Sequence, residues 1–533
     1  MYQSSPRVRR LAVMVAGTAI VATCAACTTV TRQTIVGSSG PIPAGSSTTP
    51  DQSGATASGG PASLPDGSGQ TSGVAGNNTP TSVVVPPGTT TGASGPGTNP
   101  GTSTAPSGPA STTKPGAHPS ATKRSSCTTP VKIGVSYSSD SGAGLAQVGA
   151  GGSTSSSGYA QAEQAVFNAL AADANAHGGL AGCPVTVVYH DFKSLGSDGF
   201  SGESQGECVD FAEDQHVFAV INTGLENKTL ISCLAQHGVV NVFDSNEYAP
   251  TSQDLAKYKG YLYLPHSINV GRWGSYIGML SAQGFLTKSS KVGILAADDG
   301  SGNVQSLVNN EWKPALAALG ITPQVFTFTQ IEGYSGVATT AGQFSSAVLQ
   351  FKAAGVDRVL MTPDGGDGVV FFTQVASSQG FKPLYALNSL SGVQVWSAAP
   401  AAERPGAVAI SYSIHDGAAP GATLNTNPPA TPARQHCAQV LKGKTGSAGI
   451  FPYYGFCDDF SLLVAGLAHA SAVSVGNLLA GTEQLGCSLQ LADLYTNACF
   501  GPTQHDGGKS VQLFTWNTAQ SSWNTAGAPQ PLP

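Results

Sequence analysis

The chain has 533 residues, of which only 10% are charged and 7% aromatic, and it contains 67 Gly and 34 Pro. This composition excludes one compact fold over the whole length, since no aromatic residue occurs between Tyr2 and Tyr137. The first 126 residues hold seven of the 24 Lys and Arg and two of the 30 Asp and Glu, so the remaining 407 carry a net charge of −11. This acidic balance disfavours a nucleic-acid partner, because phosphate binding needs a basic face.

Residues 1–27 are predicted to form an export signal. Three arginines within the first ten residues form the basic n-region of a signal peptide. The apolar run 11–22 that follows is shorter than a helix needs to span a bilayer. The run leads to Ala25-Ala26-Cys27, and small residues before a cysteine resemble the bacterial lipobox, whose cysteine receives a lipid. We expect lipidation at Cys27, with Cys24 as the alternative, whereas ordinary signal cleavage would leave both cysteines incidental.

Residues 28–126 are predicted to be a disordered tether. Only three charged side chains occur between residues 33 and 122, and most of the remainder is Gly, Ser, Thr, Pro and Ala. Such a stretch has almost nothing to bury and cannot offset the entropy lost on ordering. A long flexible tether suits a protein anchored to a surface.

From residue 131, short β-rich runs alternate with segments of helical length. The predicted strands of this first unit are Val131–Tyr137, Val185–Tyr189, Val217–Ile221, Val239–Phe243 and Tyr261–Leu264, and the predicted helices are Tyr159–His177, Gly206–Gln215 and Lys228–His237. Strands separated by helices predict right-handed βαβ units and therefore a parallel sheet.

The alternation then restarts. The predicted strands are Lys291–Ala296, Thr322–Thr329, Val356–Thr362, Leu384–Leu387, Ala407–Tyr412 and Val511–Trp516, and the helices are Gly271–Gln283, Val304–Leu319, Gly342–Ala354, Val369–Gln379 and Cys457–Ala472. We predict an α/β fold of two Rossmann-like lobes with parallel sheets, joined by a hinge and preceded by the disordered linker. Residues 127–265 would form the N-terminal lobe, completed by part of the C-terminal region, and residues 266–533 the C-terminal lobe and the crossover segments.

Eight cysteines lie in the body of the chain: Cys127, Cys183, Cys208, Cys233, Cys437, Cys457, Cys487 and Cys499. An even number in an exported chain favours disulfides, although eight cysteines allow 105 connectivities. Cys127 and Cys183 each precede a strand-like run and could join neighbouring strands, and local pairing suggests Cys208–Cys233, Cys437–Cys457 and Cys487–Cys499. No two of the eight have C-x-x-C spacing and H-E-x-x-H is absent, so we expect neither a metal site nor a cofactor.

Three stretches resemble one known family. "GYAQAEQAVFNALAADANAHGGLAGCPVTVVYHD" is similar to the first helix, Asn-Ala-x-Gly-Gly turn and second strand of type I periplasmic substrate-binding proteins of the branched-chain amino acid class. "HGVVNVFDSNEYAP" resembles the strand and binding loop that follow, and "FGPTQHDGGKSVQLFTW" resembles the closing segment and strand. The resemblance covers most of residues 131–517.

This resemblance implies a solute-binding protein and no enzymatic activity. The protein would capture a small polar solute, such as an amino acid or an amide, in the cleft between its lobes and deliver it to an ABC permease complex. We expect a monomer attached to the outer face of the cell membrane by its lipid. The alternative is a ligand-sensing or cell-wall-associated lipoprotein of the same fold that has no permease.

The resemblance also suggests ligand-binding positions, which fall in loops that follow strands. They are Tyr159, Glu226, Asn227, Ser245, Asn246, Asp299, Asp364 and Asp367. The family grips a carboxylate with small hydroxyl residues where Glu226 and Asn227 stand, and usually has Tyr where Asp299 stands. A Glu there would repel a carboxylate, so the acid-rich loops favour a cationic or neutral polar solute, with Asp364 or Asp367 meeting an ammonium group.

Each of these positions also has a structural interpretation. Asn227 and Asp364 suit helix N-caps and Glu226 suits a first helical turn. Ser245 and Asn246 are common turn residues, and an aromatic such as Tyr159 often belongs to a core or rim.

One motif suggests an enzyme. Gly202-Glu203-Ser204-Gln205-Gly206 matches the G-x-S-x-G nucleophile elbow of hydrolases. That elbow must follow a strand directly, whereas the nearest predicted strand ends about twelve residues before Ser204. We therefore expect no catalytic residue at this position.

Overall fold

The computed structural model describes residues 127, 129–140, 156–193, 196, 199–223, 227–243, 248–331, 334–417, 430–445 and 453–532. The predicted export signal, the lipidation site at Cys27 or Cys24 and the tether lie outside the described residues and stay predictions.

The first unit is built on a five-stranded parallel sheet with the order β2-β1-β3-β4-β5. Its strands are β1 (Val131–Tyr137), β2 (Val185–Asp191), β3 (Ala219–Asn222), β4 (Val240–Phe243) and β5 (Leu262–Tyr263). Its helices are α2 (Ser156–Ala176), α3 (Gly199–Val209) with the π-helical turn η1 (Asp210–Asp214), α4 (Lys228–Gln236) and α5 (Ser252–Lys257). The parallel sheet predicted from the βαβ pattern is confirmed. The short helix α5 was not predicted, and α3 begins seven residues before the predicted helix Gly206–Gln215.

The turn between α2 and β2 shows how local sequence fixes this geometry. The side-chain amide of Asn175 donates to the carbonyl of Val185 at 2.9 Å, and its oxygen accepts from the Val185 N–H at 2.6 Å. Gly179 has a φ of 69°, and a Cβ on it would lie 1.9 Å from the Cys183 carbonyl oxygen. The turn therefore needs Asn at the helix end and glycine at the point of close approach.

The second unit has a larger sheet with the order β12-β11-β10-β9-β8-β6-β7, and β13 pairs with β11. The strands are β6 (Val292–Asp298), β7 (Gln324–Thr329), β8 (Arg358–Met361), β9 (Leu384–Asn388), β10 (Val408–Ser411), β11 (Ser510–Asn517), β12 (Ser522–Thr525) and β13 (Gln530–Pro531). Strands β6 to β10 are parallel, as predicted, but β11 runs antiparallel to β10. The chain re-enters this sheet at the edge where β10 ends, so β11 must run the opposite way.

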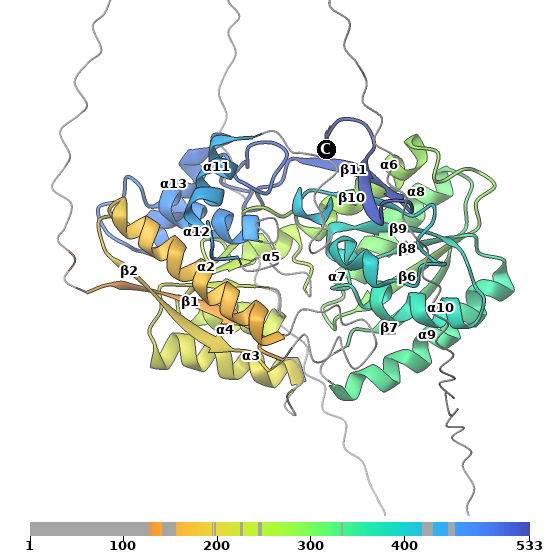
Figure 1. Ribbon diagram of the computed structural model, residues 1–533, viewed down its shortest axis with the longest axis horizontal. Helices are drawn as coiled ribbons and strands as arrows, with labels where there is room; N and C mark the ends of the chain where they lie inside the picture. The colour runs from red at the N-terminus through yellow and green to blue at the C-terminus, as the bar shows by residue number, and fades with distance from the viewer. Residues whose placement is uncertain are drawn as a thin grey trace, which may run out of the picture. The chain divides into compact units, whose positions relative to one another are not determined.

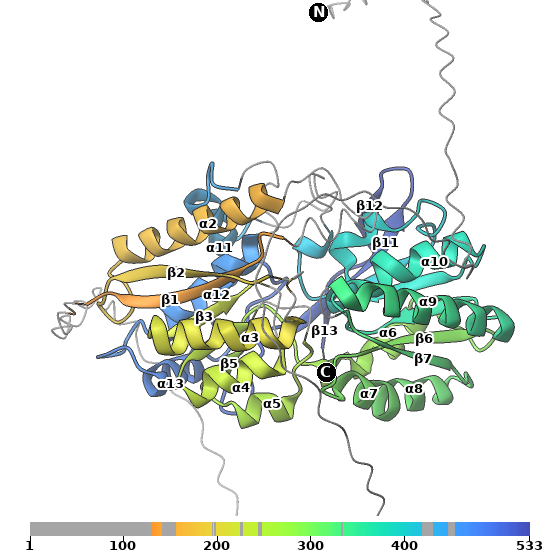
Figure 2. The same cartoon turned by 90° about the horizontal axis from the view of Figure 1, so that it is seen from below.

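Helices cover both faces of this second sheet (Figures 1 and 2). They are η2 (Val270–Ser275), α6 (Tyr276–Ala282), α7 (Asn303–Leu307), η3 (Val308–Trp312), α8 (Lys313–Ala318), α9 (Tyr334–Ala354), η4 (Gly368–Phe372) and α10 (Thr373–Ser378), with the short turns η5 (Ser389–Ser391), η6 (Val393–Ala398) and η7 (His415–Gly417). The helix predicted over Val304–Leu319 is interrupted by the π-helical turn η3. We call this unit the C-lobe and the first unit the N-lobe.

Three late helices pack on the N-lobe rather than on the C-lobe (Figure 2): α11 (Pro432–Val440), α12 (Tyr454–Gly466) and α13 (Val475–Leu485). Helices α11 and α12 contact α2, and α13 contacts α12. Phe167 of α2 stacks on Phe456 of α12 with ring centroids 4.9 Å apart. The N-lobe is therefore completed by chain that lies between β10 and β11 of the C-lobe sheet.

Three chain segments cross between the lobes, after β5, after β10 and before β11, and they are hydrogen-bonded to one another. The Leu264 N–H of the first donates to the His505 carbonyl of the third at 2.9 Å. The Ile414 N–H of the second donates to the Asp493 carbonyl of the third at 2.8 Å. The hinge is thus a single bonded unit.

Four disulfides join cysteines of the described residues: Cys127–Cys183, Cys208–Cys233, Cys437–Cys457 and Cys487–Cys499. They are the pairs that local spacing and the strand-joining argument favour, so these predicted pairings are confirmed.

Among the residues that the structure describes, none of the helices combines the length and the apolar character needed to cross a bilayer.

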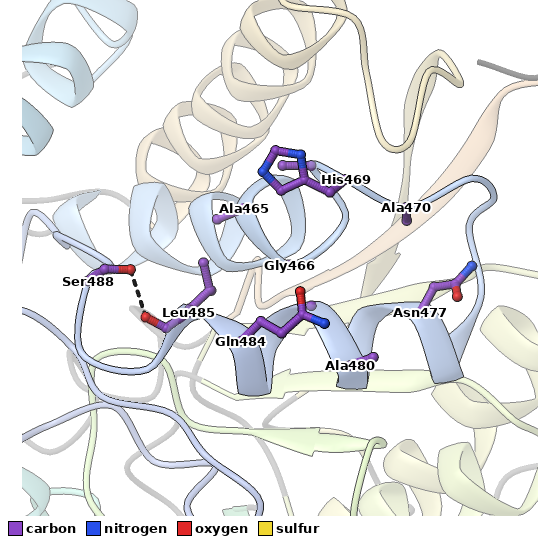
Figure 3. A pocket seen from close by; sticks show the side chains of 11 residues that line it. Ala465, Gly466, His469, Ala470, Asn477, Ala480, Gln484, Leu485 and Ser488 are labelled. Atoms are coloured by element: carbon purple, nitrogen blue, oxygen red, sulfur yellow. Dashed lines mark hydrogen bonds between the residues drawn. The ribbon is translucent and has the colours of Figure 1, made fainter. Parts of the chain in front are cut away.

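The crossing of α12 and α13 depends on a close backbone approach (Figure 3). A Cβ built on Gly481 would lie 1.7 Å from the carbonyl oxygen of Gly466. No side chain fits there without separating the two helices.

We therefore expect Gly481→Ala to lower the stability of the protein by about 1–3 kcal/mol, the usual cost of overpacking. Gly476→Ala on the same helix is the matched control, because a Cβ there meets nothing within 4 Å. It should be neutral or stabilising by up to about 1 kcal/mol. Chemical denaturation of both variants checks this, and equal stabilities would contradict the packing argument.

Candidate functional site

In open parallel sheets, ligands bind beyond the carboxyl ends of the strands. The carboxyl ends of the two sheets meet at Asn303, the first residue of α7 after β6. Its side-chain amide donates to the Tyr248 hydroxyl at 3.2 Å, the Ala249 carbonyl at 3.0 Å and the Asp254 carboxylate at 3.1 Å. All three acceptors belong to the N-lobe segment that follows β4, so the candidate site lies between the lobes.

On the N-lobe side, the chain after β1 is tied to the end of β2. The backbone N–H and the hydroxyl of Ser139 donate to the two carboxylate oxygens of Asp191 at 3.0 and 2.8 Å. Lys193 forms an ion pair with the same carboxylate. Burial acts to raise the pKa of Asp191, but the contacts with Lys193 and Ser139 outweigh it and lower that pKa. This carboxylate is therefore engaged within the protein.

Asn227 occupies the N-cap of α4. Its side-chain oxygen accepts from the Thr229 and Leu230 N–H groups at 2.9 and 3.2 Å, and its amide donates to the Phe200 carbonyl. The N-cap interpretation of this residue is confirmed, and its contact with a ligand stays a prediction. Glu226, Ser245 and Asn246 lie outside the described residues, as does the side chain of Tyr159.

On the C-lobe side, Asp299 lies in the loop that precedes Asn303. One carboxylate oxygen accepts from the N–H and hydroxyl of Ser301 at 2.9 and 2.6 Å. The other, Oδ2, is buried and has no hydrogen-bond partner in the part of the chain that is described. Burial raises the pKa of Asp299. A buried acceptor without a donor is costly, so a donor on a ligand would be favoured here.

Asp364 and Asp367 have different surroundings. Asp364 is fully buried, and its two oxygens accept from the N–H groups of Gly366 and Gly368 at 2.9 and 3.1 Å, so it holds the turn into η4. Asp367 is partly exposed and accepts from the Ile331 N–H at 2.9 Å. Burial raises the pKa of Asp367 to about 7. Of the two residues, Asp364 is fully buried and Asp367 is the one that keeps some exposed surface.

Sequence reasoning named the loop after β6 but not Asn303 or Ser301. Ser301 accepts from the Asn303 N–H at 3.1 Å and thereby links Asp299 to the interlobe contact. A signal for Asn303 existed, since it is a polar residue immediately before the predicted helix Val304–Leu319, in the loop that follows a predicted strand.

The G-x-S-x-G segment does not form a nucleophile elbow. It lies within α3, and Ser204 has no exposed surface. The expectation that Ser204 is no nucleophile elbow is confirmed by this placement.

The group of possible metal ligands found among the described residues is Cys208, Cys233 and His237. The two sulfurs are bonded to each other, so neither is a thiolate that could bind a metal ion.

The periplasmic binding protein family matches residues 130–521, so the chain belongs to this family. No curated protein matches it.

Solved structures share the fold. One is LivJ of Streptococcus pneumoniae, the substrate-binding protein of a branched-chain amino acid transporter, in complex with isoleucine: 16% identity, TM-score 0.52, covering 76% of this chain and 100% of that one. Another is the leucine-binding protein LivK of Thermotoga maritima, with 13% identity and a TM-score of 0.53. The match covers 74% of this chain and 98% of that one. A third is the substrate-binding protein of a fatty acid ABC transporter from Thermomonospora curvata, with 15% identity and a TM-score of 0.52. The match covers 75% of this chain and 92% of that one. The family and the two-lobed α/β fold predicted from sequence are thus confirmed.

One buried acid near this edge of the N-lobe gives a test of the electrostatics. Glu207 of α3 is fully buried, and Ser136 lies close to it at the end of β1. Burial raises the pKa of Glu207 from 4.5 to about 8, which the hydroxyl of Ser136 only partly offsets.

The folded protein therefore keeps a proton that the unfolded chain releases, and Glu207 makes stability fall as pH rises from about 4.5 to 8. Glu207→Gln removes this titration, so its stability relative to wild type should rise by on the order of several kcal/mol across that window. Denaturation curves at several pH values check this. Parallel pH profiles for the two proteins would show that Glu207 is ionised in the fold.

Proposed function

We propose that this protein captures a small polar solute between its two lobes, outside the cytoplasm, and delivers it to an ABC importer. The observation that carries the proposal is the interlobe contact of Asn303 with Tyr248 and Asp254, which brings the binding edges of both sheets together. Membership of the periplasmic binding protein family supports the role.

The solute class follows from the charges at this edge. Asp299 offers a buried oxygen without a donor among the described residues, and Asp367 offers a second carboxylate on a partly exposed residue. The relatives' names include amino acids and a fatty acid, so the fold accepts chemically different ligands. Because carboxylates favour donors and cations, we propose a cationic or neutral polar solute such as an amino acid derivative or an amide.

The predicted lipid at Cys27 and the tether 28–126 complete the proposal. They would attach a monomeric pair of lobes to the outer face of the membrane, near the permease that receives the solute.

A thermal-shift screen of amino acids, amides, ureas and polyamines tests this function. A ligand that binds only the folded protein stabilises it by about 2.7 kcal/mol at 100 times its Kd. We expect a hit among amines or amides to raise the melting temperature. No shift in any of these classes would contradict the proposed solute.

For a cationic hit, Asp299→Asn and Asp367→Asn should each weaken binding about 10- to 100-fold, because a hydrogen bond to a charged group contributes about 1.5–3 kcal/mol. Asp357→Asn is the matched control. It removes the same charge at the amino end of β8, where Asp357 accepts from the Lys291 N–H. Calorimetric titration of the three variants measures the effect, and affinities equal to wild type in all three would remove both acids from the site.

A further inference from the structure

A recess of about 450 Å³ lies in the N-lobe between α2, α11 and α12. Its α2 residues come from the last two turns of that helix, which runs away from the carboxyl edge of the sheet. None of the candidate ligand-binding residues between the lobes lines it. Its volume falls within the range of small-molecule sites in proteins.

The walls of the recess are mainly apolar and fixed in place. They include Leu170, Phe460, Val464, Leu489 and the disulfide Cys437–Cys457. The disulfide joins α11 to α12, so these two walls cannot separate. A preformed apolar cavity of this kind suits a hydrocarbon chain or ring.

Inside the recess, Asp458 and the side-chain oxygen of Gln490 are already engaged. The two oxygens of Asp458 accept from the Ala492 and Asp493 N–H groups at 2.6 and 2.9 Å. The side-chain oxygen of Gln490 accepts from the Ala433 N–H at 3.3 Å. The interior therefore favours an apolar group.

The mouth of the recess carries the remaining ionisable groups of its lining. Asp173 lies between two imidazoles: His436 Nε2 is 3.0 Å from one carboxylate oxygen and His177 Nδ1 is 3.4 Å from the other. Side chains at this mouth are exposed, 56% for His436 and 66% for His177. Asp173 is the acidic residue of this mouth, and a carboxylate is a strong hydrogen-bond acceptor for an ammonium group.

We propose that this recess is a second binding site, which takes a small amphiphilic amine. The apolar part of the ligand fills the space between α2, α11 and α12, and its ammonium group binds Asp173 at the mouth. The site is separate from the one proposed between the lobes.

Three probes with the same tail test the proposal: octylamine, octanol and octanoate. Titration calorimetry at pH 7.5 should show that octylamine binds at least 10-fold more tightly than octanoate, with octanol between them. Asp173→Asn should reduce this preference and leave octanol unchanged. Tighter binding of octanoate, or no binding of octylamine, would overturn the proposal.

Two tryptophan variants locate the bound probe. Val464→Trp fills the recess and should weaken octylamine binding at least 10-fold. Ala480→Trp is the matched control, because Ala480 lines a different recess, between α12 and α13 (Figure 3). Asp299→Asn should leave octylamine binding unchanged, which separates this site from the interlobe one.

Should Val464→Trp fail to fold, Leu489→Gln makes the same wall polar and should weaken the binding of octylamine and octanol together. Octylamine binding that survives the wall variant unchanged would place the probe elsewhere and contradict the proposal.

Discussion

The arrangement of the two lobes depends on one buried carboxylate, Asp493. It accepts hydrogen bonds from the Ser413 hydroxyl and from the backbone N–H and Nδ1 of His415, and these residues belong to the segment leaving the C-lobe sheet. Asp493 itself lies on the segment that returns to that sheet. Burial acts to raise the pKa of Asp493, but His415 and Ser413 outweigh it, so the pKa is lowered and the group stays charged. The charge therefore lies on one crossing segment and its partners lie on the other. Separating the two segments would leave a buried charge without partners, which is costly in free energy, so Asp493 holds the two crossings together.

The surrounding groups extend this constraint to the rest of the hinge. Arg434 of α11 donates to the carbonyls of Ala492 and Leu494 on the returning segment, at 2.7 and 2.6 Å. Asp506 accepts from the N–H of Asn269 at 3.0 Å and from Arg272 at 3.2 Å, which binds the first crossing to the third. The three crossings therefore form one polar cluster between two apolar lobes. The capture of a solute that we propose would turn the lobes about this cluster.

The parts of the fold that the sequence predicts are those set by local patterns. The five-stranded N-lobe sheet follows from alternating strands and helices, and the disulfide pairs follow from spacing. Helix α13, with Gly476 and Gly481 in it, has little local signal, and its position depends on the close approach to Gly466. The direction of β11 depends on where the chain re-enters the sheet.

At the site, the loop after β6 was predicted, whereas the contact of Asn303 with Tyr248 exists only because two distant loops meet. Asp364 was predicted to contact the ligand, but its carboxylate accepts hydrogen bonds from backbone N–H groups of the turn in which it lies.

The order of the disulfides has a consequence for how the chain reaches its native state. The eight body cysteines pair in chain order, the first with the second, the third with the fourth, the fifth with the sixth and the seventh with the eighth. The separations within these pairs are 56, 25, 20 and 12 residues. A chain that emerges N-terminus first into an oxidising compartment therefore presents each of these cysteines with its native partner before any later one. Closing each loop as it appears reaches the native set without thiol–disulfide exchange, a step that takes seconds to hours. No cysteine lies between Cys233 and Cys437, so the strands β6 to β10 can assemble in that interval without covalent constraint.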